Sequence, residues 1–196
     1  MQTNRIRSLR IKRGLDVVFS ILGILLFSPL LILIAFLVKT SIPGSVLYRQ
    51  TRIGYKQKRF KILKFRSMKT DPDTKEDLPC CSEGRVPFVG MWIRRLKLDE
   101  LPQLYNILIG DMSFIGPRPY IEKESLELPA ERYSMRPGLT GLAQVNGNRE
   151  LGWDERTAYD IDYVRSFGFL MDVKILMRTV MTVILGEKAC LKHRET

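Results

Sequence analysis

The chain has 196 residues, of which 45% are hydrophobic, so it is long enough to bury the core of one domain. Ordinary glycine and proline contents and the absence of internal repeats exclude collagen-like, disordered and solenoid architectures, while three cysteines and the single His193 argue against a disulfide framework and against histidine-dependent catalysis or metal binding. The formal net charge of +11 is unevenly distributed, because residues 1–70 carry +14 and the remainder carries −3.

Residues 17–38 form an uncharged apolar run of 22 residues. A helix rises 1.5 Å per residue, so this run is long enough to cross a hydrocarbon core of about 30 Å. Five cations precede the run and ten follow it up to Lys69 with no acidic residue among them. Dense Lys/Arg marks the cytoplasmic side of a membrane, and here both flanks carry it.

Ser28 and Pro29 lie in the middle of the apolar run. Proline removes one helical hydrogen bond and kinks or breaks a helix, and the serine hydroxyl can satisfy the carbonyl that is freed. Together with the basic flanks, this favours a helix that enters the membrane, bends or breaks at Ser28-Pro29 and returns to the same face. A kinked helix that crosses the membrane once is the alternative.

After the apolar run, residues typical of turns separate short segments whose apolar residues recur at strand or helix spacing. Residues 45–69 alternate apolar and basic side chains and predict short strands, whereas residues 71–87 predict a loop. The expected helices cover residues 99–109, part of 121–134, 153–165 and about 169–185. The last helix has a broad apolar face, which either packs on the core or lies in the membrane interface.

Asp99 and Glu100 open the helix expected over residues 99–109. Carboxylates at a helix N-terminus stay ionised, which suits a nucleophile or a magnesium ligand, although Asp99 could equally cap the helix. The surrounding cations favour chemistry on a phosphoryl group, since that chemistry needs positive charge around a carboxylate. These cations are Arg94, Arg95 and Lys97, together with Arg118 and Arg136 on proline-fixed loops.

Two other motifs suggest different functions. The pairs Asp71/Asp73 and Asp160/Asp162 match the short D-x-D pattern that some metal-dependent glycosyltransferases use, but such a tripeptide arises easily by chance. The basic residues of 49–69 could form a nucleic-acid patch on a non-enzymatic binding module. Beside a membrane segment, however, they more economically meet anionic headgroups or phosphorylated substrates, so we expect no nucleic-acid partner.

Five motifs in order give the chain a specific resemblance. They are KRGLDVVFS (12–20), SP (28–29), KFRSM (64–68), LDELPQLYNILIGDMSFIGPRP (98–119) and RPGLTGLAQVNG (136–147). With them the chain resembles the bacterial sugar transferases, the small monotopic phosphoglycosyl transferases that move a sugar 1-phosphate from a UDP-sugar onto polyprenyl phosphate. The resemblance runs from Lys12 to about Val183.

The resemblance implies roles for particular residues. Asp99 would be the nucleophile that expels UMP and holds the phosphosugar covalently, Glu100 would assist, and Mg²⁺ would bind near Asp99. The matching cations Lys64, Arg66, Arg94, Arg118 and Arg136 would be phosphate contacts. Lys97 replaces the usual small hydroxyl residue, and Asn148 stands where the family has an arginine, which leaves open whether Arg149 replaces that arginine.

We therefore expect a mainly helical α+β enzyme at the cytoplasmic face of a bacterial inner membrane. Residues 1–39 would form the basic N-terminus and re-entrant helix, and residues 40–196 a compact catalytic domain with interfacial helices. Its partners would be a UDP-sugar, undecaprenyl phosphate and membrane lipid. A homodimer is left open, and the sequence does not name the sugar.

Overall fold

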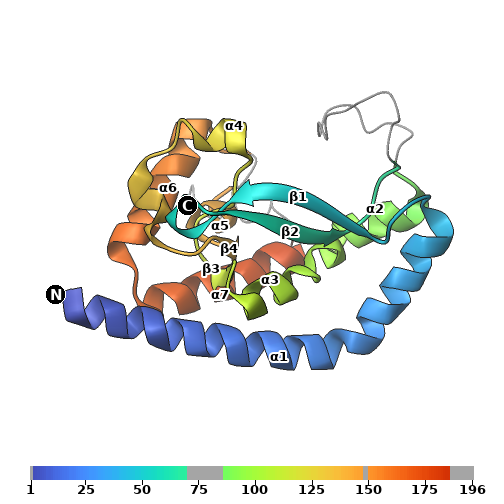
Figure 1. The fold of residues 1–196 in the computed structure, drawn as a ribbon, viewed down its shortest axis with the longest axis horizontal. Helices are drawn as coiled ribbons and strands as arrows, with labels where there is room; N and C mark the ends of the chain where they lie inside the picture. Colours follow the sequence, from blue (N-terminus) through green and yellow to red (C-terminus); the bar gives the residue numbers. More distant parts are fainter. Residues whose placement is uncertain (1, 70–85, 148–149, 186–196) are drawn as a thin grey trace.

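The computed structural model describes residues 2–69, 86–147 and 150–185, and its elements make a mainly helical α+β fold, as the sequence predicts (Figure 1). The helices are α1 (Gln2–Ser41), α2 (Phe88–Arg95), α3 (Gln103–Ile109), α4 (Glu122–Ser125), α5 (Leu142–Val145), α6 (Trp153–Ser166) and α7 (Phe169–Leu185). The 3₁₀ turns are η1 (Tyr55–Gln57), η2 (Leu98–Glu100) and η3 (Ala130–Ser134). The strands are β1 (Leu47–Ile53), β2 (Arg59–Phe65), β3 (Ser113–Ile115) and β4 (Gly138–Thr140).

The long helix α1 bends but does not break. Figure 1 shows it running beneath α7 and α3 and then turning up toward α2. Pro29 lies inside the helix and cannot donate to the carbonyl of Leu25, four residues earlier. The Ser28 hydroxyl donates to that carbonyl at 2.8 Å. The compensation predicted for Ser28 is thus confirmed, and of the predicted kink or break the structure shows a bend, because α1 is continuous from Gln2 to Ser41.

The first half of α1 is fastened to the rest of the chain by charged side chains. The Lys12 ammonium lies 2.6 Å from a carboxylate oxygen of Asp172 on α7. Arg13 donates two hydrogen bonds to carbonyl oxygens in the last turn of α3, and the buried Asp16 accepts hydrogen bonds from β3. These contacts fix the direction of α1 relative to α3, so the helix is part of the scaffold.

The predicted strands of residues 45–69 are confirmed as an antiparallel hairpin of β1 and β2. Its register places Tyr48 opposite Lys64 and Arg52 opposite Phe60. Asn106 of α3 pairs with β2: its side-chain oxygen accepts from the Leu63 amide at 3.0 Å, and its amide nitrogen donates to the Lys61 carbonyl at 2.8 Å. The hairpin is therefore held in register against α3. Strands β3 and β4 form a small parallel pair.

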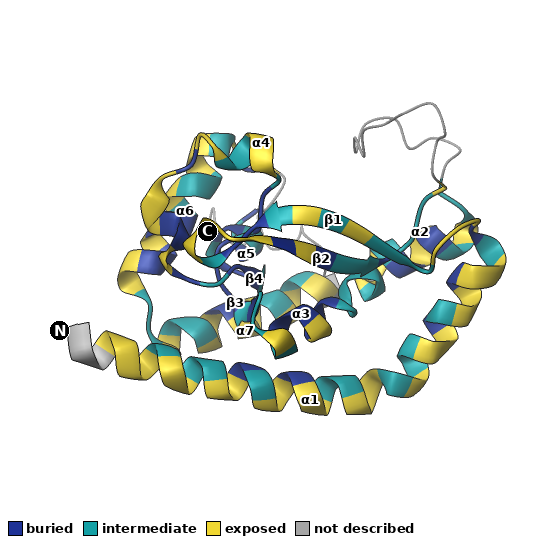
Figure 2. Ribbon diagram, in the orientation of Figure 1, coloured by how far each residue is buried: buried dark blue, intermediate teal, exposed yellow. Residues whose placement is uncertain are grey.

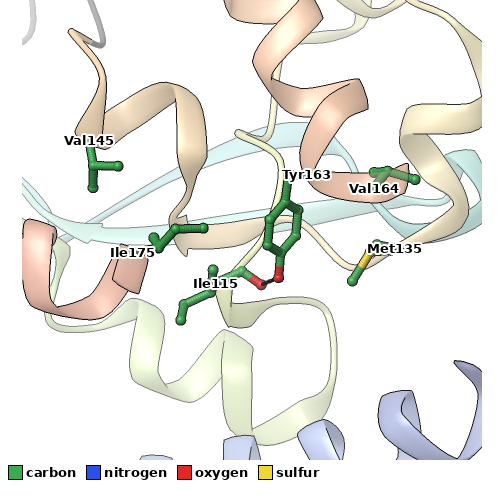
Figure 3. Close-up of a cluster of buried hydrophobic side chains, with 6 residues drawn as sticks. All are labelled: Ile115, Met135, Val145, Tyr163, Val164 and Ile175. Carbon is green, nitrogen blue, oxygen red and sulfur yellow. Dashed lines mark hydrogen bonds between the residues drawn. The ribbon is translucent and has the colours of Figure 1, made fainter. Parts of the chain in front are cut away.

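The apolar core consists of several clusters. One joins β3, α5, α6 and α7, and Figure 3 shows Tyr163 at its centre, donating a hydrogen bond from its hydroxyl to the Ile115 carbonyl. Helix α7 contributes Ile175 to this cluster but leaves most of its apolar face open, with Leu170 77% exposed. The interfacial alternative for this face therefore fits better than core packing.

Candidate functional site

The acidic pair lies in the 3₁₀ turn η2 and not in helix α3. Lys97 precedes it in a left-handed conformation with φ 57°, and α3 begins only at Gln103, after Pro102. Proline suits the start of a helix, which explains why α3 begins there. The predicted start at Asp99 is therefore wrong, and so is the capping alternative, because no side chain caps α3.

The segment that carries the pair lies on the inner side of the bent helix α1. Leu98 and Leu101, on either side of Asp99-Glu100, pack against the cluster that contains Ile34 and Val38 of the second half of α1. Helix α3 packs against the middle of α1 through Leu104. The pair thus lies in the angle of the bent helix, which places it beside the apolar segment.

Lys64 forms a direct side-chain contact to the pair. Its ammonium lies 2.6 Å from a carboxylate oxygen of Glu100. Lys64 follows the part of β2 that Asn106 holds, so the strand register positions this ion pair. Lys64 was a predicted phosphate contact, and the structure places it on the pair itself.

The surroundings move the pKa values of the two carboxyls in opposite directions. Burial, followed by the charge of Glu100, raises the pKa of Asp99 above its ordinary value. For Glu100 burial also acts upward, but the charge and hydrogen bond of Lys64 and the charge of Arg118 outweigh it, so its pKa is lowered. Acidic pairs whose environments separate their pKa values have distinct chemical roles. Asp99 is therefore the more basic carboxyl of the pair, and Glu100 is the more acidic one.

Three more cations act on the pair electrostatically. Arg94 on α2 favours the ionised form of Asp99, and Arg118 and Lys97 favour that of Glu100. The backbone of Arg118 is held by a buried side chain, because Arg132 donates a hydrogen bond to the Arg118 carbonyl. The structure thus brings Lys64, Arg94 and Arg118 around the pair, in a field suited to a phosphoryl group.

Two predicted phosphate contacts have other partners. Arg66 donates to the Pro43 carbonyl and to the Ser45 hydroxyl, and it lines a hollow of about 640 Å³ at the base of the hairpin. Arg136 donates to the Gly110 carbonyl at the C-terminal end of α3, the end opposite to the pair. These contacts support the turn after α1 and the end of α3. Arg149 and Asn148 lie outside the described residues.

The structure describes only one of the two D-x-D motifs. Asp71 and Asp73 lie outside the described residues. Asp160 is 1% exposed and pairs with Arg132 at 2.8 Å, so it belongs to the interior and not to a metal site. Among the described residues, no group of three or more His, Cys, Asp or Glu side chains could hold a metal ion.

Sequence reasoning missed Asn106 and the pair Arg132–Asp160. Asn106 stands inside the apolar stretch LYNILI, and a polar residue at such a position was the available signal. Arg132 and Asp160 are 28 residues apart, and nothing local in the sequence indicates that they meet.

Comparisons with known proteins show the family of the chain. Residues 7–186 match the family described as bacterial sugar transferase. The chain is 41% identical to the exopolysaccharide production protein ExoY of Sinorhizobium fredii, covering 89% of this chain and 86% of that protein. It is 44% identical to a UDP-glucose:undecaprenyl-phosphate glucose-1-phosphate transferase of Caulobacter vibrioides, covering 91% and 71%. A UDP-N-acetylgalactosamine-undecaprenyl-phosphate N-acetylgalactosaminephosphotransferase of Aeromonas hydrophila is 38% identical, over 90% of this chain and 44% of that protein.

Proposed function

Because the chain belongs to the bacterial sugar transferase family, we propose that it transfers a sugar 1-phosphate from a UDP-sugar to undecaprenyl phosphate and releases UMP. The observation that carries the proposal is the pair Asp99–Glu100, with separated pKa values, among Lys64, Arg94 and Arg118. The names of two relatives state this kind of reaction with different sugars, glucose and N-acetylgalactosamine, so the proposal does not specify the sugar.

The reaction proceeds in two displacements. An Asp99 carboxylate oxygen attacks the β-phosphorus of the UDP-sugar, the bond from that phosphorus to the bridging oxygen breaks, and UMP leaves with the electron pair. A phosphate oxygen of undecaprenyl phosphate then attacks the same phosphorus and frees Asp99, which gives the polyprenyl-diphosphate sugar. Two steps replace one difficult displacement. Glu100, held by Lys64, orients the reacting groups.

Mg²⁺ is the cofactor that fits this chemistry. It typically takes one or two carboxylates from a protein and completes its shell with water and substrate phosphate oxygens. Asp99 is the carboxylate suited to this role, since Glu100 already pairs with Lys64. When bound, the ion would offset the charge of the diphosphate.

The surface of the chain suits insertion into one face of a membrane. Helix α1 is long and apolar enough to cross a membrane by length and composition. Figure 2 shows exposed residues along its length, and they include large apolar side chains before and after Pro29. Exposed apolar residues on α2 and α7, such as Phe88 and Leu170, extend this surface. We propose that α1 enters and leaves through the cytoplasmic face and that α2 and α7 lie in the interface.

The nucleotide product tests the proposed reaction. With a panel of UDP-sugars and undecaprenyl phosphate, we expect UMP to appear in step with lipid-linked sugar, as measured by chromatography of the nucleotides. Release of UDP would indicate instead a glycosyltransferase, for which Asp71→Asn would be the inactivating variant. Salt-dependent binding of nucleic acid without turnover would indicate a binding module.

The topology has a direct test. We expect tags placed before Met1 and after Thr196 to be inaccessible to a membrane-impermeant label in intact spheroplasts and accessible after lysis, because both basic flanks of α1 stay on the cytoplasmic side. Labelling of either tag in intact spheroplasts would contradict the re-entrant arrangement. A tag on a periplasmic protein serves as the control for label access.

A further inference from the structure

A second arginine, Arg52, lies beside the loop that carries Arg118. Side chains alternate across a strand, so the register of β1 and β2 places Arg52 on the same face of the hairpin as Lys64. The end of β1 is bonded to the chain that follows Arg118, because the Ile53 amide donates to the Tyr120 carbonyl at 3.0 Å. The Arg52 guanidinium itself reaches the Pro119 carbonyl at 3.5 Å. The hairpin thus brings Arg52 beside Arg118, whose charge also acts on Glu100.

The charge of Arg52 is weakly compensated. Its side chain is 23% exposed, and it forms an ion pair with the more exposed Glu124, at 3.9 Å. Burial and the charge of Arg118 lower the pKa of Arg52, so the two guanidinium groups repel each other. Two cations held together at a partly buried position favour an anion between or beside them.

The hydrogen bonds of Arg52 orient its guanidinium without neutralising it. Its Nη2 donates to the side-chain oxygen of Gln50, and its buried Nε has no partner. A residue that only linked β1 to the Pro117–Pro119 loop by a hydrogen bond would not need a positive charge. Placing a cation beside Arg118 costs free energy, and the hydrogen bond to this loop does not offset that cost. A phosphoryl group in the site would recover it through charge-assisted hydrogen bonds.

We propose that Arg52 is a phosphate-binding residue that acts together with Arg118 on a phosphoryl group bound beside Asp99–Glu100. This inference rests on the proposed function, which supplies two sources of that group. One is the diphosphate of the UDP-sugar, and the other is the phosphate of the polyprenyl acceptor. Both present anionic oxygens that a guanidinium binds in the same way.

Two measurements with Arg52→Gln separate the sources. The first is binding of UDP-glucose by calorimetry in an Asp99→Asn background, where turnover does not obscure binding. If the diphosphate is the ligand, Arg52→Gln weakens this binding by roughly ten-fold or more. If the lipid phosphate is the ligand, UDP-glucose binding is unchanged and the KM for undecaprenyl phosphate rises by roughly ten-fold in the enzyme that keeps Asp99.

The matched control is Arg59→Gln, which removes the same charge from the opposite face of the hairpin, where Arg59 pairs with Glu122. It should change neither quantity. An Arg52→Gln variant with unchanged Kd and KM would overturn the inference, whether or not its Tm falls. Should Arg52→Gln fail to fold, Arg52→Lys, which keeps the charge but loses the planar fork, carries the same measurements, with a smaller weakening expected.

Different results would reject the inference about Arg52 and the proposed function. Release of UMP by the parent together with no effect of Arg52→Gln would reject only the inference. Absence of UMP release would reject the proposed function, and the calorimetric measurement with UDP-glucose would still decide whether Arg52 binds a diphosphate.

Discussion

Replacing Asp99 by asparagine is expected to abolish sugar-phosphate transfer, with a loss on the order of 10⁴-fold or more, the scale seen when a covalent nucleophile is removed. The amide has nearly the same shape but cannot attack phosphorus. Burial and the charge of Glu100 raise the pKa of Asp99, so the neutral amide should also be tolerated by the fold. The loss should therefore appear in activity without a lower Tm.

Single-turnover experiments without the lipid acceptor isolate the first displacement. The parent should release about one UMP per active site and gain the mass of a sugar phosphate on intact protein, whereas Asp99→Asn should show neither. Asp154→Asn, which changes an exposed acid at the start of α6, is the control and should behave as the parent. A full burst of UMP from Asp99→Asn would contradict the assignment of the nucleophile.

Local chemistry made part of this structure predictable. The bend of α1 follows from the missing N–H of Pro29 and the neighbouring hydroxyl of Ser28, which act within one helical turn. The hairpin follows from the alternation of residues 45–69, and helix α7 from its apolar spacing. In each case the residues that decide the structure lie close together in the sequence.

Long-range partners were not predictable in this way. Arg118 and Arg136 look alike in sequence, because both stand next to proline, but one acts on Glu100 and the other binds the Gly110 carbonyl. The stiff backbone beside proline indicated that each arginine side chain is held in place. Only the folded structure shows which group each arginine acts on. The start of α3 was missed because Lys97 adopts a left-handed conformation, which nothing in its residue type requires.

The second large effect is expected at the buried pair Arg132–Asp160, whose side chains are 2% and 1% exposed. Arg132→Met should lower the free energy of unfolding by about 3–5 kcal/mol, since Asp160 would stay buried without its partner. Chemical unfolding in detergent micelles measures this change. Gln substitutions in the exposed pair Arg165–Glu131 are the control and should have little effect, because solvent screens exposed ion pairs. If Arg132→Met changed the free energy of unfolding no more than the control substitutions do, the buried pair would add no stability.

A double variant then separates stability from positioning. Arg132→Met with Asp160→Leu removes both charges, so it should recover most of the lost stability. It should not recover activity, because the hydrogen bond from Arg132 to the Arg118 carbonyl would be lost, and this bond helps to position the cation whose charge acts on Glu100. We expect the KM for the UDP-sugar to rise and Tm to approach that of the parent. Recovery of both quantities would mean that the Arg118 loop keeps its position without Arg132, and that the buried pair serves the fold alone.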